Sequence, residues 1–335
     1  MKKNMAGFLI LLLLMTAAVS GCSAGNTPDY TAEAVNVGGV SIPLGEVNFY
    51  LRYQQTQMQG AYGLYFGEDF MNQDLMGLGT PYGSTIRDSV VETLKEYYVV
   101  EAHAGDIGVT LTEEEKSRAA ETADAFLAAN DSKTLKAMSA DGTTVTHVLE
   151  LMALQSKVYK DRAGTIDTQV DPESVAQKRI SYVASSIMGT TDEEGNVTDL
   201  TEEELSEKRT QMERVLAGAK ESQDLAAAAE AEGLSYGKDS SSLDETVLAA
   251  ADALPEGGFS EVIETENSYY IVCMESTFDE DATETARENE LSRREREAYD
   301  GWLQPLLDET VITTSDEQIQ SLTFERIFNM PVEEE

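Results

Sequence analysis

The first 21 residues constrain the fold most, because they combine a basic start with a short apolar run and so separate a leader from the chain that folds. Lys2 and Lys3 precede the apolar run from Phe8 to Leu14. This run is too short to span a bilayer as a stable helix, and its flanks are typical of a secretory signal peptide over residues 1–21. We therefore expect the folded protein to lie outside the cytoplasm.

A cysteine follows the apolar run within a group of small residues, Val19-Ser20-Gly21-Cys22. This tetrapeptide resembles the lipobox of bacterial lipoproteins. The resemblance implies diacylation of the Cys22 thiol and attachment to the cell membrane, with a Gram-positive source expected, and it makes residues 22–34 a flexible tether. The alternative is an ordinary signal peptide that has a cysteine near its cleavage site by chance.

Only Cys273 remains if Cys22 is acylated, so no intramolecular disulfide can stabilise this exported chain. Stability must come from packing. The chain has 335 residues with 41% apolar content, which is enough for two modest domains or one discontinuous domain. Cys273 lies in the strand-like run Tyr269–Met274, where a buried small apolar residue is favoured over a reactive thiol.

The charge balance is strongly acidic, with 62 Asp and Glu residues against 24 Lys and Arg residues and a net charge of -38. Such a chain repels a phosphate backbone, so nucleic acids are excluded as partners. The same field favours basic or unfolded cationic polypeptides, although a solvated charged surface also explains it. The two histidines, His103 and His147, are too far apart for a local metal motif, and we expect no cofactor.

The first half of the chain predicts a hairpin followed by helices. Val35 to Ile42 indicates two short strands about the Gly38-Gly39 turn, and a helix is expected from about Val47 to Met58. Further helices are predicted from Ile86, from the capping box formed by Thr112 and Glu115, and from Thr144 to Gly164.

A boundary is expected at Asp171-Pro172, because Pro is tolerated only at the start of a helix and Asp can cap it. Strands are predicted at Ile180–Ile187 and Tyr269–Met274. Between them, helices are predicted at 201–216, which begins with a capping box of Thr201 and Glu204, and at 225–231. A long charged helix follows Asp281, and Pro305 should kink or end it by removing an amide donor.

Two regions resemble the domains of a known class of protein. Val35–Tyr50, Ser89–Ala102 and Ile107–Glu115 are similar in order and spacing to the N-terminal chaperone region of SurA and PrsA type foldases. Lys178–Met274 resembles a parvulin, the prolyl isomerase domain inserted in such foldases, and the best match runs from Ala249 to Ile263.

The resemblance implies an α+β protein. A mainly helical SurA-N-like chaperone domain would be built from both chain ends, residues 35–170 and 280–335, the latter a returning helix and an acidic tail. A parvulin-like domain, a small antiparallel sheet flanked by helices, would be inserted at residues 171–277.

Parvulins carry two histidines on adjacent central strands, and this chain has Tyr182 and Tyr270 at the corresponding positions. The resemblance further places Leu243, Val247 and Phe259 in the proline pocket. Rotation of an X-Pro bond faces a barrier of about 18–20 kcal/mol, which an apolar pocket lowers if it binds the twisted amide best. With both histidines replaced and a smaller pocket, isomerase catalysis and simple binding both remain open.

The stretch from Gly60 to Gly83 is too aromatic for a linker and too rich in glycine for a regular element. Its candidate client-binding residues are Tyr62, Tyr65, Phe66, Phe70, Met71 and Met76. Flat aromatic groups and soft methionines suit a surface that grips many unfolded chains. The alternative is a loop that packs these side chains onto its own domain.

These features together imply a membrane-anchored extracytoplasmic foldase for newly secreted, unfolded polypeptides. One alternative is a non-catalytic chaperone or scaffold that uses the parvulin fold only for binding. A solute-binding lipoprotein of a transporter is less favoured, because the repeated strand-helix-strand pattern of two lobes is absent.

Overall fold

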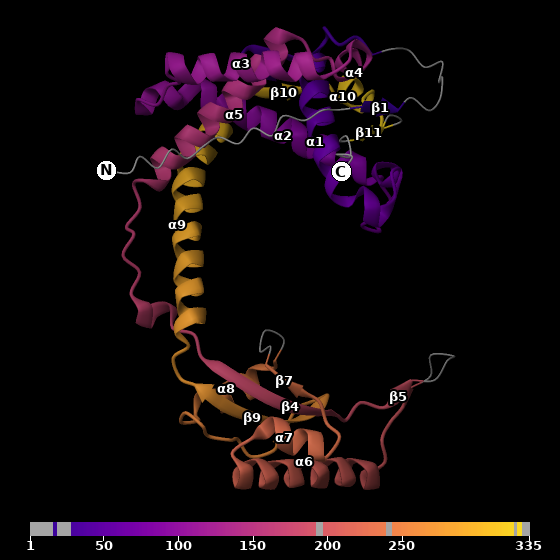
Figure 1. The fold of residues 1–335 in the computed structure, drawn as a ribbon, viewed down its shortest axis with the longest axis vertical. Coiled ribbons are helices and arrows are strands. Elements are labelled where there is room, and N and C mark those ends of the chain that lie inside the picture. Colours follow the sequence, from indigo (N-terminus) through magenta and orange to yellow (C-terminus); the bar gives the residue numbers. More distant parts are fainter. Residues whose placement is uncertain (1–15, 19–27, 192–196, 239–242, 325–326, 330–335) are drawn as a thin grey trace. The chain divides into compact units, whose positions relative to one another are not determined.

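The computed structural model describes residues 16–18, 28–191, 197–238, 243–324 and 327–329. Contacts between residues divide the chain into two compact units (Figure 1). Unit 1 comprises Met1–Ile166 and Arg294–Glu335, and unit 2 comprises Asp167–Arg293. The chain is mainly helical with small antiparallel sheets, which confirms the predicted α+β class.

The sheet of unit 1 joins the two ends of the described chain. Strands β2 (Glu33–Val37) and β3 (Val40–Pro43) form the predicted hairpin, and both turn glycines have positive φ, 59° at Gly38 and 92° at Gly39. Strand β10 (Ile312–Thr314) pairs with the outer edge of β2, which the sequence did not reveal. The short strands β1 (Thr16–Ala18) and β11 (Ile327–Asn329) pair separately.

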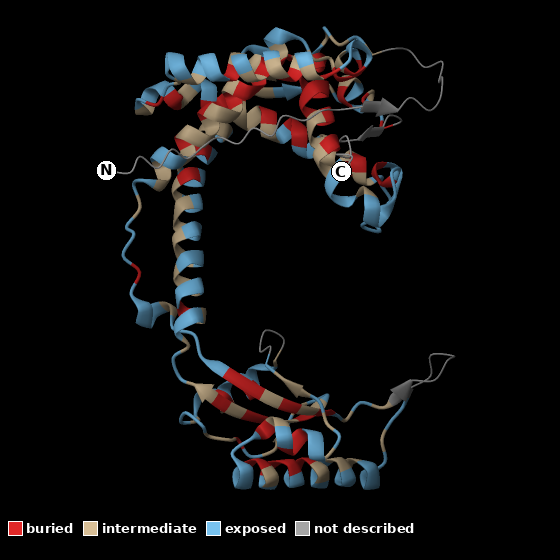
Figure 2. Cartoon of the chain, viewed as in Figure 1, coloured by how far each residue is buried: buried red, intermediate tan, exposed pale blue. Residues whose placement is uncertain are grey.

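The helices of unit 1 surround one core. They are α1 (Leu44–Phe66), η1 (Phe70–Asn72), α2 (Tyr82–His103), η2 (Ala104–Ile107), α3 (Glu113–Ala129), α4 (Ser132–Met138), α5 (Gly142–Ala163), α10 (Asp316–Gln320) and the C-terminal part of α9 (Glu280–Glu309). The predicted capping box of Thr112 and Glu115 begins α3. Buried residues line the inner faces of the helices (Figure 2).

Two helices differ from the sequence-based expectation. Helix α1 continues eight residues beyond Met58, through Gly60 and Gly63, and ends at Phe66 before Gly67, whose φ is 85°. Helix α9 passes through Pro305 to Glu309, so the proline does not end it. Tyr299 and Leu303 are buried in the core on that helix, and their packing outweighs one lost amide donor.

The side chain of His147 connects three helices of unit 1 through ion pairs. His147 on α5 lies 3.3 Å from the carboxylate of Glu46 on α1 and 3.4 Å from that of Glu101 on α2. The Tyr98 hydroxyl also donates to Glu46, at 2.9 Å. Hydrogen bonds to Glu101 and Glu46 raise the pKa of His147 to about 10, and burial opposes this only in part. His147 is therefore the cation that neutralises a buried carboxylate.

Unit 2 is a four-stranded antiparallel sheet in the order β7-β4-β9-β8. Its strands are β4 (Arg179–Ser186), β7 (Tyr236–Gly237), β8 (Ile263–Glu264) and β9 (Ser268–Ser276). Helices α6 (Glu202–Ser222), which begins at the predicted capping box of Thr201, and α7 (Leu225–Ala231) cover one face; α8 (Glu245–Asp252) packs on the other. Strands β5 (Thr190–Thr191) and β6 (Val197–Thr198) form a separate pair.

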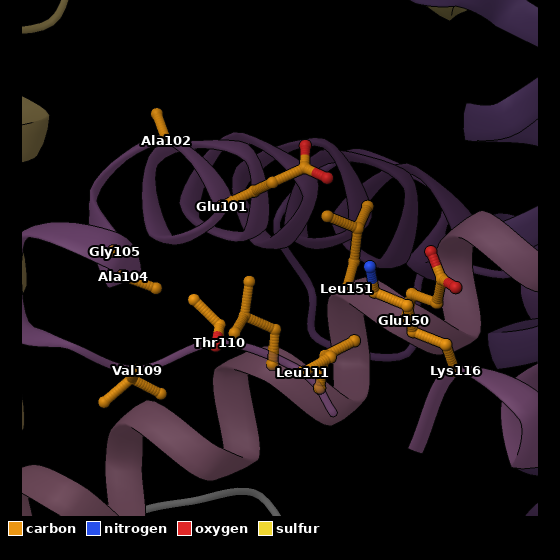
Figure 3. Close-up of a pocket in the computed structure, with 11 residues that line it drawn as sticks. Glu101, Ala102, Ala104, Gly105, Val109, Thr110, Leu111, Lys116, Glu150 and Leu151 are labelled. Atoms are coloured by element: carbon orange, nitrogen blue, oxygen red, sulfur yellow. The ribbon is translucent and has the colours of Figure 1, made fainter. Parts of the chain in front are cut away.

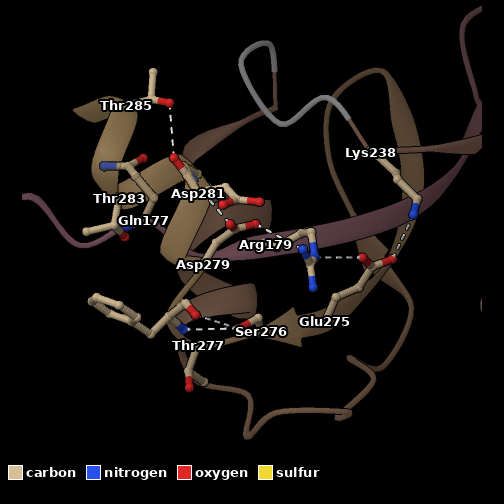
Figure 4. A network of polar contacts seen from close by, with 12 residues as sticks. Gln177, Arg179, Lys238, Glu275, Ser276, Thr277, Asp279, Asp281, Thr283 and Thr285 are labelled. Carbon is tan, nitrogen blue, oxygen red and sulfur yellow. Dashed lines mark hydrogen bonds and ion pairs between the residues drawn. The ribbon is translucent and has the colours of Figure 1, made fainter. Parts of the chain in front are cut away.

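A polar network holds the start of α9 to the sheet of unit 2 (Figure 4). Arg179 on β4 bridges Glu275 at 3.3 Å and Asp279 at 3.2 Å. The backbone of Gln177 accepts from the Asp279 amide and donates to the Thr283 hydroxyl. Upstream, the short helix η3 (Pro172–Val175) follows Asp171, which caps it as predicted. These contacts fix where the sheet ends and α9 begins.

Replacing His147 with Gln should lower the free energy of unfolding by about 1–3 kcal/mol at pH 6, because the buried Glu46 loses its cation. The raised pKa means that this stabilisation is complete below pH 6.5, the ordinary value, and is lost as the pH rises toward about 10. Urea unfolding at pH 6 and pH 10 checks this. The control is His103→Gln, whose partner Asp106 is exposed, and a deficit that stayed constant between the two pH values would contradict the assignment.

Candidate functional site

Seven large apolar side chains at the end of α1 and in the segment after η1 are exposed. We call these seven residues the apolar patch: Tyr62, Leu64, Tyr65, Phe66, Leu75, Met76 and Leu78. Leu64 is 97% exposed and Tyr65 is 81% exposed. Large apolar side chains normally lose water on folding, so a cluster of them left in solvent indicates a binding surface.

The structure divides the six predicted client-binding residues into two groups. Tyr62, Tyr65, Phe66 and Met76 belong to the apolar patch. Phe70 and Met71 are each only 1% exposed and belong to the core, so their prediction as surface residues was wrong. Helix η1 follows directly after the turn at Gly67, and the Phe70 ring there packs 5.9 Å from that of Tyr82.

Three members of the patch, Leu64, Leu75 and Leu78, were not predicted. A signal for the first was present, because apolar residues at 62, 64, 65 and 66 point around a helix in every direction. The loop that carries Leu75 and Leu78 is held by Asp74, whose carboxylate accepts from the amides of Leu78 at 2.9 Å and Gly79 at 2.7 Å. The patch therefore rests partly on an ordered loop.

The sequence segment that carries the patch contains only negative charges. Between Arg52 and Arg87 the sequence contains no Lys or Arg, whereas Glu68, Asp69 and Asp74 lie within the segment. A surface that combines apolar side chains with surrounding carboxylates favours apolar segments that carry positive charge.

Tyr182 and Tyr270, the residues at the parvulin histidine positions, lie on the adjacent central strands β4 and β9. Tyr182 pairs with Val272 and Tyr270 pairs with Ala184, so both side chains project from one face of the sheet. Their ring centroids are 6.1 Å apart with an interplanar angle of 55°. The two aromatic groups form a contact pair beside the cluster that α8 covers.

Gly237 on β7 makes room for the ring of Tyr182. The two residues are paired across the strands, and a Cβ atom at position 237 would lie 2.5 Å from Tyr182 Cζ and 2.8 Å from its hydroxyl. No side chain fits there without moving the tyrosine. The aromatic residue at 182 thus depends on the glycine at 237.

The remaining pocket residues do not form one open pocket. Val247 on α8 is fully buried, in a cluster against which Leu243 and Tyr270 pack. Phe259 lies on the opposite face, because it pairs with Cys273 and packs against the cluster under α6 and α7. A single site containing Tyr182, Leu243, Val247 and Phe259 is therefore not present.

Cys273 lies on that opposite face and is partly buried. The pKa of its thiol is raised, mainly by burial and to a smaller extent by the Glu275 carboxylate. The neutral thiol is favoured, which agrees with a packing role. The other predicted cysteine site, Cys22, lies outside the described residues.

A pocket of about 310 Å³ lies in unit 1 between the end of α2, the segment Val109–Leu111 and α5 (Figure 3). Leu151 and Leu154 contribute apolar surface, whereas Glu101, Glu150 and Lys116 are charged. Within the described part of the chain, no three His, Cys, Asp or Glu residues are placed to hold a metal ion. No helix in that part is long and apolar enough to cross a bilayer.

Comparison with solved structures finds matches of low sequence identity and low TM-score. A PrsA foldase from Lactococcus lactis is 14% identical, with 87% of this chain and 97% of that chain covered and a TM-score of 0.32. The chain is similar to PrsA foldases. A Bacillus cereus PrsA is 17% identical over 76% and 97% of the two chains, with a TM-score of 0.34.

A SurA-like chaperone structure from Campylobacter jejuni is 12% identical, over 85% of this chain and 100% of that chain, with a TM-score of 0.22. No family model and no curated protein matches the sequence. The resemblance that the sequence predicted was to the same two types of protein.

Replacing Gly237 with Ala should lower the free energy of unfolding of unit 2 by about 1–3 kcal/mol, because the new methyl group displaces the Tyr182 ring. Denaturant unfolding followed by circular dichroism measures this. In a Tyr182→Ala background the same substitution should cost little, and Lys238→Ala serves as the neighbouring control. Equal costs of Gly237→Ala in both backgrounds would show that the tyrosine is not the obstacle.

Proposed function

We propose that the protein is a membrane-tethered extracytoplasmic foldase that holds unfolded segments of newly translocated polypeptides. The apolar patch is the observation that carries this proposal. The tether would be the chain that follows Cys22, whose acylation the sequence predicts. Unit 2, which contains the four-stranded sheet, would contribute to polypeptide binding rather than to catalysis.

The chemistry of the patch suits unfolded clients. Aromatic, leucine and methionine side chains bind apolar segments without demanding one sequence, because dispersion and the hydrophobic effect are not directional. The acidic residues beside them attract the basic segments of a client and repel other acidic chains. The net charge of -38 keeps a protein with such a surface soluble.

Proline isomerisation is the second candidate function, and the position of the tyrosine pair favours it. Tyr182 and Tyr270 occupy adjacent strands in the arrangement that the parvulin resemblance implies. Catalysis also requires an apolar pocket that a proline ring can enter. Full burial of Val247 weighs against such a pocket, so we favour binding.

Removing the apolar patch should weaken chaperoning. In protein lacking residues 1–22, the triple substitution Leu64→Ser, Tyr65→Ser and Leu78→Ser should raise the concentration needed to suppress aggregation of an unfolded client on the order of tenfold, because apolar contact area is lost. Light scattering of a denatured client measures this. Val311→Ser, which removes another exposed apolar side chain of unit 1, is the matched control, and equal suppression by both variants would refute the role of the patch.

Proline isomerisation should be undetectable above the uncatalysed rate. The same protein lacking residues 1–22 is mixed with a proline-containing tetrapeptide, and the rate of cis-to-trans conversion is followed. We expect no acceleration because Val247 is fully buried and Phe259 lies on the opposite face of the sheet from Tyr182 and Tyr270. Acceleration that disappears on Leu243→Asp would instead establish an isomerase and reverse our preference.

A further inference from the structure

The described chain near the C-terminus is held in unit 1 through its backbone. Arg52 on α1 donates to the carbonyl of Thr323 at 2.7 Å, and Asn72 on η1 donates to that of Phe324 at 3.2 Å. Arg87 on α2 donates to the carbonyl of Leu322 at 3.5 Å. Three consecutive carbonyls are thus bound by side chains, a mode of contact that any extended peptide can make.

A slot for one aromatic side chain accompanies these contacts. The Phe324 ring is 7% exposed, and the Arg52 guanidinium lies 5.5 Å from its centroid. The ring covers Gly83, where a Cβ atom would lie 2.5 Å from it and 2.9 Å from the Met71 carbonyl. The absence of a side chain at Gly83 therefore creates the space that the ring fills.

The side chain of Arg52, one donor of this groove, is held in place by other residues of α1. Arg52 is 6% exposed, and its other nitrogens donate to Asn48 at 3.0 Å and to Gln55 at 2.7 Å. The Nε atom of Arg87 is buried and has no hydrogen-bond acceptor among the described residues. Arg52 is thus a fixed donor, and the Arg87 Nε atom is a donor that could bind a further carbonyl. The groove is therefore suited to a peptide that is longer than Leu322–Phe324 or placed differently.

A row of aromatic ring contacts links the residues of the groove to those of the apolar patch. Tyr62 contacts Phe66, Phe66 contacts Phe70, and Phe70 contacts Tyr82, with centroids 5.9 to 6.4 Å apart. Tyr82 precedes Gly83 of the slot, and Asn72 lies in the same helix as Phe70. The residues that hold Leu322–Phe324 are therefore in packing contact with those of the patch.

We propose that the groove between α1, η1 and α2 binds extended polypeptide segments that carry a phenylalanine or similar aromatic residue. The chain's own Leu322–Phe324 occupies it in cis and gives way to a client segment. This inference rests on the proposed function, since it names the class of client. A site that is mostly occupied in cis has a reduced apparent affinity, so the segment sets how strongly clients bind.

The test measures binding of a fluorescent extended peptide with one phenylalanine, and of its alanine counterpart, to the full chain by anisotropy. Phe324→Ala should bind the phenylalanine peptide about tenfold more tightly than the unaltered chain, because the slot is vacated. Thr323→Ala, whose side chain is exposed and whose carbonyl is retained, is the matched control and should bind as the unaltered chain does. Circular dichroism verifies that each variant is folded.

Hydrogen exchange on the unaltered chain provides a second readout that needs no variant. The Leu322 amide donates to the Ile319 carbonyl at 3.2 Å. Binding of the phenylalanine peptide should speed exchange in segment 319–324, whereas the alanine peptide should not. Peptide binding without faster exchange, or equal affinity of a folded Phe324→Ala variant, overturns the displacement while leaving suppression of client aggregation intact. Failure of every form to bind peptide or suppress aggregation overturns both proposals.

Discussion

Pairing of β10 with β2 is the contact on which unit 1 depends, because it joins segments that lie about 275 residues apart in the chain. Ile312 pairs with Val37 and Thr314 with Val35, and the Ser315 amide donates to the Ala34 carbonyl at 2.8 Å. Buried residues of α9 and the segment after α10 complete the same core. Unit 1 is therefore incomplete until the last part of the chain is present, whereas unit 2 is contiguous in sequence.

The charges of unit 1 follow from the same packing. In a chain with so few cations, the buried carboxylate of Glu46 is paired with His147 and accepts a hydrogen bond from the Tyr98 hydroxyl. Among the described residues, neither a lysine nor an arginine is its partner. Arg52, the buried cation of α1, is directed instead toward the C-terminal segment. Helix α1 thus carries the carboxylate that fastens α2 and α5, the cation that holds Leu322–Phe324, and the end that bears the apolar patch.

The features that could be predicted from the sequence are those that a few neighbouring residues determine. The Gly38-Gly39 turn and the capping boxes at Thr112 and Thr201 are encoded within a few residues, and each is present. Pairing of β10 with β2 and continuation of α9 through Pro305 depend on tertiary contacts that no local pattern contains. The position of Tyr182 beside Tyr270 was accessible only through the parvulin resemblance, and their catalytic role stays a prediction.

In the candidate site, too, some features could be predicted from the local sequence and others depend on tertiary structure. Composition indicated that residues 60–83 are unusual, yet the side on which each residue falls depends on the turn at Gly67. That turn buries Phe70 and leaves Tyr65 in solvent, although both are aromatic residues in one glycine-rich stretch. Phe259 was misplaced for a related reason, since its pairing with Cys273 decides its face and strand pairing is not a property of the segment alone.

The tyrosine at position 182 has a physical consequence for the packing of unit 2. A phenol ring is larger than an imidazole, and at position 182 it extends over the neighbouring strand, where only glycine leaves room. The ring also contacts that of Tyr270, with centroids 6.1 Å apart, while Val247 on α8 is fully buried. Packing of this kind stabilises a sheet without a disulfide.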